Sequence, residues 1–180
     1  MHNSFVLSKY SFFLRMTSIL IIGLCFSVLF LGFFPFNNIA NAHFVEPKKE
    51  DICPICGMSV SEHPLWVAVI MFSDGKHVKL HGPKSMFTYY FNLETYDKKY
   101  KTENVSTMHV TDYGTAKHVK AQVAHYVIQS NIQGPMGADL IPFKDNASAE
   151  AFAKDHGGNI LRFKDITPKI VNALENIITD

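Results

Sequence analysis

Hydrophobic residues are concentrated at the start of this chain. Residues 16–41 form an uncharged and mostly apolar run, and the only ionic side chains before it are Lys9 and Arg15. The run closes with the small-x-small pattern of an export cleavage site, which ends at Ala42. This order predicts that residues 1–42 are a secretory signal peptide cleaved after Ala42. The alternative is an uncleaved membrane anchor, because about 20 apolar residues are enough to span a bilayer. Both predict an extracytoplasmic, periplasmic location for the rest of the chain.

Beyond a polar leader, residues 43–51, which is expected to be flexible, the apolar pattern becomes that of short strands and helices. We place a first unit over residues 52–114 and expect it to contain strands over 65–72 and 76–80, a helix over 84–93 and a strand over 106–111. The turn signal Ser73-Asp74-Gly75 makes the first two strands a hairpin. Pro83 suits the first turn of the helix.

The same order of elements recurs in residues 115–180. The expected elements are strands over 125–129 and 139–143, a helix over 147–154, a strand over 159–163 and a final helix over 168–177. Asp145 or Asn146 can cap the first of these helices, and Gly157-Gly158 can close it. The sequence therefore predicts an α+β fold of two consecutive small ββαβ units that follow the N-terminal segment. Aromatic side chains are expected to supply much of the core: Trp66, Phe72, Phe87, Tyr89, Tyr90, Tyr126, Phe143 and Phe152.

The charge balance excludes one class of partner. Residues 43–180 carry 15 basic and 16 acidic side chains, because the two ionic residues before them are both basic. A domain without excess positive charge has no field for nucleic acid. The expected core is also large enough to fold without disulfides, so the two cysteines after residue 42 are free for chemistry.

Those cysteines belong to the segment Cys53-Pro54-Ile55-Cys56-Gly57-Met58, which places two thiols and a thioether within six residues. Soft sulfur ligands outside the reducing cytosol favour a Cu(I) site. Three other interpretations compete: a local structural disulfide, a redox-active thiol pair, and two surface thiols without a role. A redox pair normally opens a helix that lowers the pKa of one thiol, and Gly57 and Pro64 are unfavourable for such a helix.

Zinc is a further competitor, because the two cysteines together with His77 and His81 have the composition of a zinc site. If 76–80 is a strand, residues four apart are separated by roughly 13 Å, so both histidines cannot reach one ion. Zinc also has little use for a thioether, whereas Cu(I) accepts thiolate and thioether ligands together. Met58 therefore favours copper.

The motifs of residues 51–163 together resemble the NosL family of copper chaperones. The resemblance rests on the order of these segments: Cys56-Gly57-Met58, Glu62-His63-Pro64, Asp74-Gly75, Gly82-Pro83-Lys84-Ser85-Met86-Phe87, Thr111-Asp112-Tyr113-Gly114, Tyr126-Val127-Ile128-Gln129-Ser130, Gly134-Pro135-Met136-Gly137-Ala138 and Leu140-Ile141-Pro142-Phe143. It implies an extracytoplasmic Cu(I) carrier, built from two ββαβ units, that helps to assemble the copper centres of nitrous oxide reductase, the enzyme of denitrification. The commonest membrane attachment in that family is a lipidated cysteine, whereas this sequence offers a signal peptide or an anchor.

The resemblance also implies metal ligands. The family's cysteine and methionine fall on Cys56 and Met58, the leading candidates. Cys53 is a further candidate, although some members of the family have only the second cysteine. Met136, in a Gly-x-Met-Gly turn, is either a thioether ligand from the second unit or a turn residue folded onto the core. The remaining candidates are methionines expected to serve in packing, Met71, Met86 and Met108, and three alternatives for a third ligand, His63, His81 and His109.

We expect this chain to exchange a metal rather than to catalyse a reaction. A thiolate and one or two thioethers would hold Cu(I) in a partly exposed, low-coordinate site from which an acceptor protein can take it. The expected acceptor is nitrous oxide reductase or its maturation machinery. No combination of nucleophile, base and oxyanion donors suggests a hydrolase. The alternative function is a thiol-disulfide oxidoreductase, or a redox or zinc-binding protein, that uses Cys53 and Cys56.

Overall fold

The computed structural model describes residues 44–175. The predicted signal peptide or anchor, residues 1–42, lies outside the described residues. Within the described range, no helix combines the length and the apolar character needed to cross a membrane.

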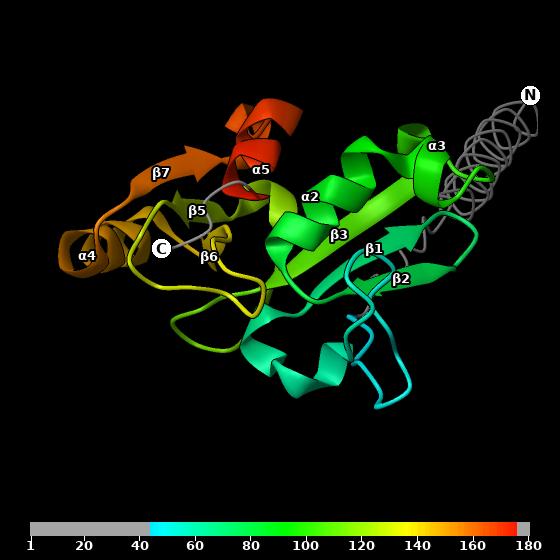
Figure 1. Ribbon diagram of the computed structural model, residues 1–180, viewed down its shortest axis with the longest axis horizontal. Coiled ribbons are helices and arrows are strands. Elements are labelled where there is room, and N and C mark those ends of the chain that lie inside the picture. The colour runs from blue at the N-terminus through cyan, green and yellow to red at the C-terminus, as the bar shows by residue number, and fades with distance from the viewer. Residues whose placement is uncertain (1–43, 176–180) are drawn as a thin grey trace, which may run out of the picture. The chain divides into compact units, whose positions relative to one another are not determined.

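The first of two antiparallel sheets has the strand order β2-β1-β3-β4. Its strands are β1 (Ala68–Phe72), β2 (His77–Leu80), β3 (Val105–Thr111) and β4 (His118–Lys120). Helices α2 (Pro83–Phe91) and α3 (Leu93–Tyr96) connect β2 to β3, and α2 packs against β1 and β2 (Figure 1). The central strand β1 is almost wholly buried, which explains why its sequence is a continuous apolar run rather than an alternating one.

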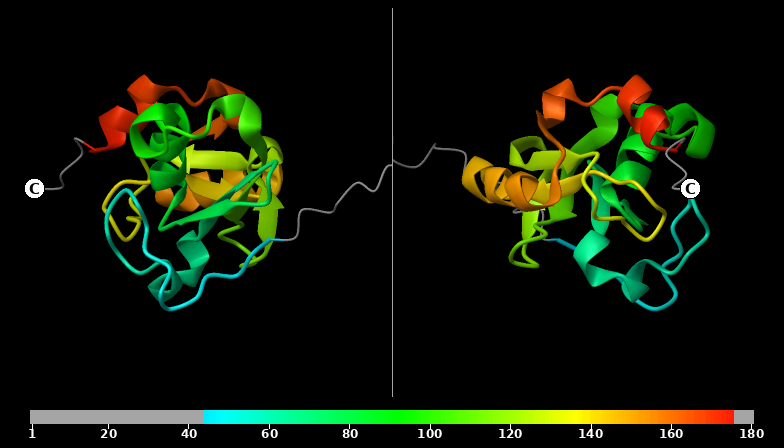
Figure 2. Two further views of the ribbon diagram at one scale, coloured as in Figure 1. Left: turned by 90° about the vertical axis from the view of Figure 1, so that its right-hand side faces the viewer. Right: turned by 60° about the vertical axis from the view of Figure 1, so that its left-hand side comes forward.

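The second sheet has the order β6-β5-β7. Its strands are β5 (His125–Ile128), β6 (Ile141–Phe143) and β7 (Asn159–Arg162), with α4 (Asn146–His156) between β6 and β7. Helix α4 covers this sheet, and the last helix, α5 (Pro168–Glu175), packs against α2 of the first half (Figure 2). The predicted α+β class is confirmed, with two antiparallel sheets. The unit boundary between residues 114 and 115 stays a prediction.

The two sheets share a hydrophobic core. Phe87 of α2 lies with its ring 5.5 Å from that of Tyr126 on β5 and 5.2 Å from that of Phe163. A smaller cluster under α4 contains Trp66 and Phe143. Of the eight aromatic residues expected in the core, all are buried except Tyr90 and Phe152, which are half-buried.

Several element boundaries differ from those predicted. Residues 64–66 form a 3₁₀ turn (Pro64–Trp66) and not the start of β1, because proline fixes φ and lacks the N–H that a strand would need. The strand expected over 139–143 begins only at Ile141, since the Asp139 side chain occupies the N–H of Leu140. Strand β4 and helix α3 are too short to give a sequence pattern. The cap of α4 is Asp145, which accepts a hydrogen bond from the Ser148 N–H, as predicted.

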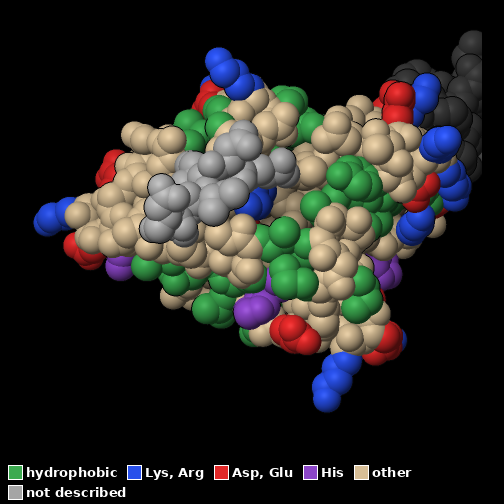
Figure 3. Space-filling model, in the orientation of Figure 1, with side chains coloured by type: hydrophobic (Ala, Val, Ile, Leu, Met, Phe, Trp, Pro, Cys, Tyr) green, Lys and Arg blue, Asp and Glu red, His purple; other side chains and the backbone are tan. Residues whose placement is uncertain are grey.

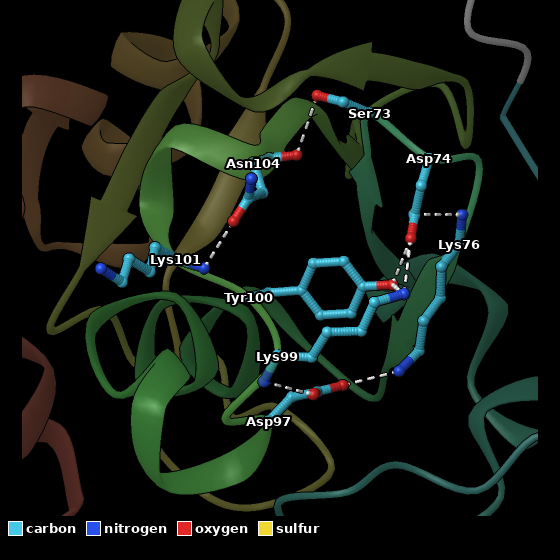
Figure 4. Close-up of polar contacts among 8 residues, drawn as sticks. All are labelled: Ser73, Asp74, Lys76, Asp97, Lys99, Tyr100, Lys101 and Asn104. Carbon is cyan, nitrogen blue, oxygen red and sulfur yellow. Dashed lines mark hydrogen bonds and ion pairs between the residues drawn. The ribbon is translucent and has the colours of Figure 1, made fainter.

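The β1–β2 hairpin is held by a polar network around Tyr100 (Figure 4). The Tyr100 hydroxyl and the Lys99 ammonium both donate to the Asp74 carboxylate, at 2.7 and 2.9 Å. These two donors hold the pKa of Asp74 well below its usual range. The Tyr100 ring in turn stacks on Phe72 at 3.9 Å, so the exposed turn is attached to the core.

The start of the described segment also contacts the first sheet. Phe44 stacks on the His118 ring of β4 with 3.3 Å between centroids, and Glu46 lies 3.2 Å from His118 Nε2. Part of the leader that we expected to be flexible therefore packs on β4 in this structure.

Candidate metal site

The sulfur motif forms a tight loop closed by its own backbone. Ile52 and Ser59 form an antiparallel bridge, and the Cys53 N–H donates to the Met58 carbonyl at 2.9 Å. The Gly57 N–H donates to the Cys53 carbonyl at 2.9 Å, and Gly57 has a φ of 74°, which glycine adopts without a steric penalty. The sequence Cys-x-x-Cys-Gly-Met therefore folds as a closed turn and not as the start of a helix.

The two thiols have different surroundings. Cys53 is fully buried in the main core, whereas Cys56 is half-buried, and both are free cysteines. Met58 is half-buried in the same loop. Of the two cysteines, Cys56 is therefore the more accessible to a ligand from outside.

The Cys56 sulfur faces the ring of His81. Its Nδ1 lies 3.9 Å from Cys56 Sγ, and its side chain is only 2% exposed just beyond the end of β2. The other ring nitrogen, Nε2, is buried without a hydrogen-bond partner. The His63 ring lies 4.9 Å away, edge-on to His81. The structure thus separates His81 from the other candidate histidines, which sequence reasoning treated as equal.

The electrostatics of this pair favour neutral groups. Burial raises the pKa of the Cys56 thiol, and the neighbouring Cys53 thiol raises it further, against backbone hydrogen bonds that lower it. Burial and the nearby His63 lower the pKa of His81. At neutral pH these shifts favour a protonated thiol beside a neutral imidazole, which has a lone pair available for a metal.

Met136 reaches this region from the second half of the chain. It lies in a turn closed by two hydrogen bonds between Gly134 and Gly137, of 2.7 and 3.1 Å, and it is 41% exposed. It lines a surface pocket of about 260 Å³ together with Ile55 of the sulfur loop. The fold therefore brings the Met136 turn beside the loop that carries Cys56, although 80 residues separate the two in the sequence.

The other sequence candidates lie elsewhere. Met86 and Met108 are buried in the main core, and Met71 packs against it, as expected for packing residues. His109 is on β3, which β1 separates from β2, and its ring lies edge-on to Phe44. His77, at the other end of β2 from His81, is exposed.

Among the described residues, no three side chains of the types His, Cys, Asp and Glu gather as a metal site would require. On the face shown in Figure 3, hydrophobic side chains lie next to a histidine and acidic side chains. Ile52, Leu65 and Met136 are among the large hydrophobic residues that stay exposed.

The fold and the loop together define a small α+β protein with a sulfur-rich turn beside a buried histidine. A family model described as NosL matches residues 44–171, so the chain belongs to the NosL family. It is 28% identical over 124 residues to the copper-binding lipoprotein NosL of Stutzerimonas stutzeri, a match that covers 64% of this chain and 62% of that protein. The chain therefore aligns with less than two thirds of that relative.

A solved structure gives the fold independently. The crystal structure of the copper chaperone NosL from Shewanella denitrificans superimposes with a TM-score of 0.62 at 23% sequence identity. The match covers 71% of this chain and 98% of that one. The described part of this chain therefore has the fold of that protein over nearly its whole length.

Proposed function

We propose that this protein is an extracytoplasmic chaperone that binds Cu(I) as cargo and delivers it for assembly of the copper centres of nitrous oxide reductase. Family membership supports the proposal, as do the similarities to a copper-binding lipoprotein and to a copper chaperone. The observation that carries it is the approach of Cys56 Sγ to Nδ1 of the buried His81, at 3.9 Å.

The proposed ligands are Cys56, Met58 and His81, with Met136 as a thioether from the second half. A thiolate and thioethers suit a soft Cu(I) ion, and a neutral imidazole is compatible with them. Cys53 is an optional ligand, because its side chain is fully buried in the core. The unpartnered Nε2 of His81 supports a role for this ring beyond hydrogen bonding within the protein.

Transfer would proceed by ligand exchange. The Cys56 thiol releases its proton when it binds the metal, and an incoming ligand from the acceptor bonds to the metal before a donor ligand leaves. Met136 is the most exposed of the proposed ligands, so it is the first that an acceptor can replace. No reaction of a substrate is required, and we propose that the protein is not an enzyme.

The geometry weakens the thiol oxidoreductase alternative. A nucleophilic cysteine needs a depressed pKa, whereas burial and Cys53 raise the pKa of Cys56. The motif also lies in a closed turn and not at a helix N-terminus. For localisation, we propose export through residues 1–42, with membrane association if that segment is retained.

The proposal is tested by titrating the reduced, full-length protein in detergent with Cu(I) or Zn(II) under anaerobic conditions, against a competing chelator. Cys56→Ser and Met58→Leu should each weaken Cu(I) binding by tenfold or more, and Cys53→Ser should have a smaller effect. Met71→Leu is the matched control, because Met71 is half-buried on β1 and is not a proposed ligand.

Tight Zn(II) binding without Cu(I) binding would contradict the copper assignment. Wild-type affinity in Met58→Leu, combined with loss of a thiol-exchange activity in either cysteine variant, would instead support the oxidoreductase. Delivery is tested by mixing the Cu(I)-loaded protein with copper-free nitrous oxide reductase and its maturation proteins. Copper that stays with the donor would refute the proposed client.

A further inference from the structure

The carboxylate of Asp139 has no role in the proposed copper site, yet it is buried and only 6% exposed. Its Oδ1 accepts the Lys84 N–H and the Leu140 N–H, both at 2.7 Å. A buried carboxylate is costly unless it is hydrogen-bonded, so these two contacts indicate what the group does in the fold.

Asp139 acts as a helix cap from the opposite half of the chain. Lys84 is the second residue of α2, whose N-terminal N–H groups have no partners within the helix. Gly82, at the cap position, has no side chain to accept them. Asp139 supplies the missing acceptor, and the helix dipole favours a negative charge there.

A second contact ties the Met136 turn to the same place. The Lys84 ammonium donates to the Met136 carbonyl at 3.0 Å, and Lys84 is itself 6% exposed. One lysine thus holds Asp139 through its backbone and Met136 through its side chain. Since two hydrogen bonds close the turn internally, fixing both points leaves the turn little freedom to move.

Two glycines make room for this arrangement. A Cβ at Gly82 would lie 2.5 Å from Asp139 Oδ2, and a Cβ at Gly134 would lie 3.0 Å from Asp139 Cβ. Gly82, which leaves space for the Asp139 carboxylate, directly follows the proposed ligand His81 in the chain. The contact between the halves is therefore built beside the copper site.

We propose that Asp139 is a positioning residue, which fixes the Met136 turn on the N-terminus of α2 and thereby sets the place of the Met136 thioether relative to Cys56 and His81. This inference rests on the proposed function for its consequence in copper binding. The structural part, that Asp139 holds the turn, is independent of copper.

The structural part is tested by hydrogen exchange in the metal-free, full-length protein in detergent. Asp139→Ala should increase exchange at the Lys84 amide and at Gly134 and Gly137. Asp139→Asn keeps a carbonyl Oδ1 and should restore slow exchange. Asp145→Ala is the matched control, because Asp145 caps α4 in the same way through Ser148 and should speed exchange only there. Exchange unchanged in Asp139→Ala would overturn the proposal.

Copper affinity tests the consequence. Asp139→Ala and Met136→Leu should each weaken Cu(I) binding about tenfold, and the double variant should lose no more affinity than either single one. Asp139→Asn should bind as the wild type does. Additive losses, or full affinity in Asp139→Ala despite faster exchange, would overturn the link to the site. If the wild type binds no Cu(I), the proposed function fails, and hydrogen exchange alone decides whether Asp139 holds the turn.

Discussion

The burial of the Asp139 carboxyl predicts an unusual pH dependence of the free energy of unfolding. Burial raises the pKa of its carboxyl to about 6 from an ordinary value of 3.8, although hydrogen bonds from the Lys84 and Leu140 N–H groups and the Lys84 charge lower it. A carboxyl whose pKa is higher in the folded state binds its proton more tightly there than in the unfolded chain. Its favourable contribution is therefore complete below about pH 4 and is lost as pH rises through 6.

The size of the effect follows from the shift. Roughly two pKa units correspond to about 3 kcal/mol between the two protonation states. In Asp139→Asn the group cannot titrate, and the amide keeps an acceptor for the two N–H groups. The unfolding free energy of the wild type minus that of Asp139→Asn should therefore decrease by about 2–3 kcal/mol between pH 3.5 and pH 8.

Urea unfolding over this pH range measures the difference. The chain has one tryptophan, Trp66, which is buried. Trp66 lies close to Asp139, because a Cβ on Gly134 would contact both side chains. Its fluorescence therefore reports loss of this region directly. Asp145→Asn is the control, because the Ser148 hydrogen bonds lower the pKa of Asp145 and give the opposite sign: stability lost as pH falls.

A difference between the wild type and Asp139→Asn that does not change with pH would refute the reasoning. A difference that grows as pH rises would also refute it. In that case the two N–H donors and the helix dipole would stabilise the carboxylate by more than burial destabilises it. A difference that decreases with rising pH indicates a carboxyl that burial favours in its neutral form, whereas one that grows indicates a charged helix cap.

Four further variants test the stability of the fold in the same urea assay. Gly158→Ala should cost about 3 kcal/mol or more, because φ is 104° and the new Cβ would lie 2.5 Å from a carbonyl oxygen of β5. Gly75→Ala, also at positive φ but in open space, should cost only about 1 kcal/mol, and equal losses would contradict the steric argument. Tyr126→Phe should cost about 1–2 kcal/mol, since it leaves the Ala121 carbonyl without its buried 2.8 Å hydrogen bond; an unchanged midpoint would show that water replaces the hydroxyl. Asp145→Ala should cost about 1 kcal/mol through loss of the α4 cap, and a neutral result would show that the cap is dispensable.

The fold was largely predictable from the sequence where local chemistry decides it. The turn at Gly75, the Asp145 cap and the Gly157 end of α4 each depend on residues within a few positions of one another, and the structure has all three. Strand β4 was missed because three residues give no measurable periodicity. The start of β1 was misplaced because Leu65 and Trp66 are apolar but follow a proline that begins a 3₁₀ turn.

The candidate site also has one part that local sequence predicts and another that it does not. Cys53, Cys56 and Met58 are recognisable because they lie within one closed turn. The approach of His81 to Cys56 joins residues 25 positions apart, and the contact of Asp139 with Lys84 joins residues 55 positions apart. Such contacts depend on how distant segments pack, and the hydrophobic periodicity of each segment does not encode that packing.

One sequence signal for the nonlocal part was nevertheless present. His81 lies between a strand whose last two residues are buried and a helix that begins at Pro83. The cap position of this helix is Gly82, which has no side chain to accept a hydrogen bond. A helix start that lacks its own cap and is then buried requires an acceptor from elsewhere. The acidic residue that supplies it must itself be buried, and Asp139, between Ala138 and Leu140 in an apolar segment, is an acid placed where burial is expected. Pairing an uncapped helix start with an acid in an apolar run would have predicted the contact between the halves, and hence the approach of the Met136 turn to the sulfur loop.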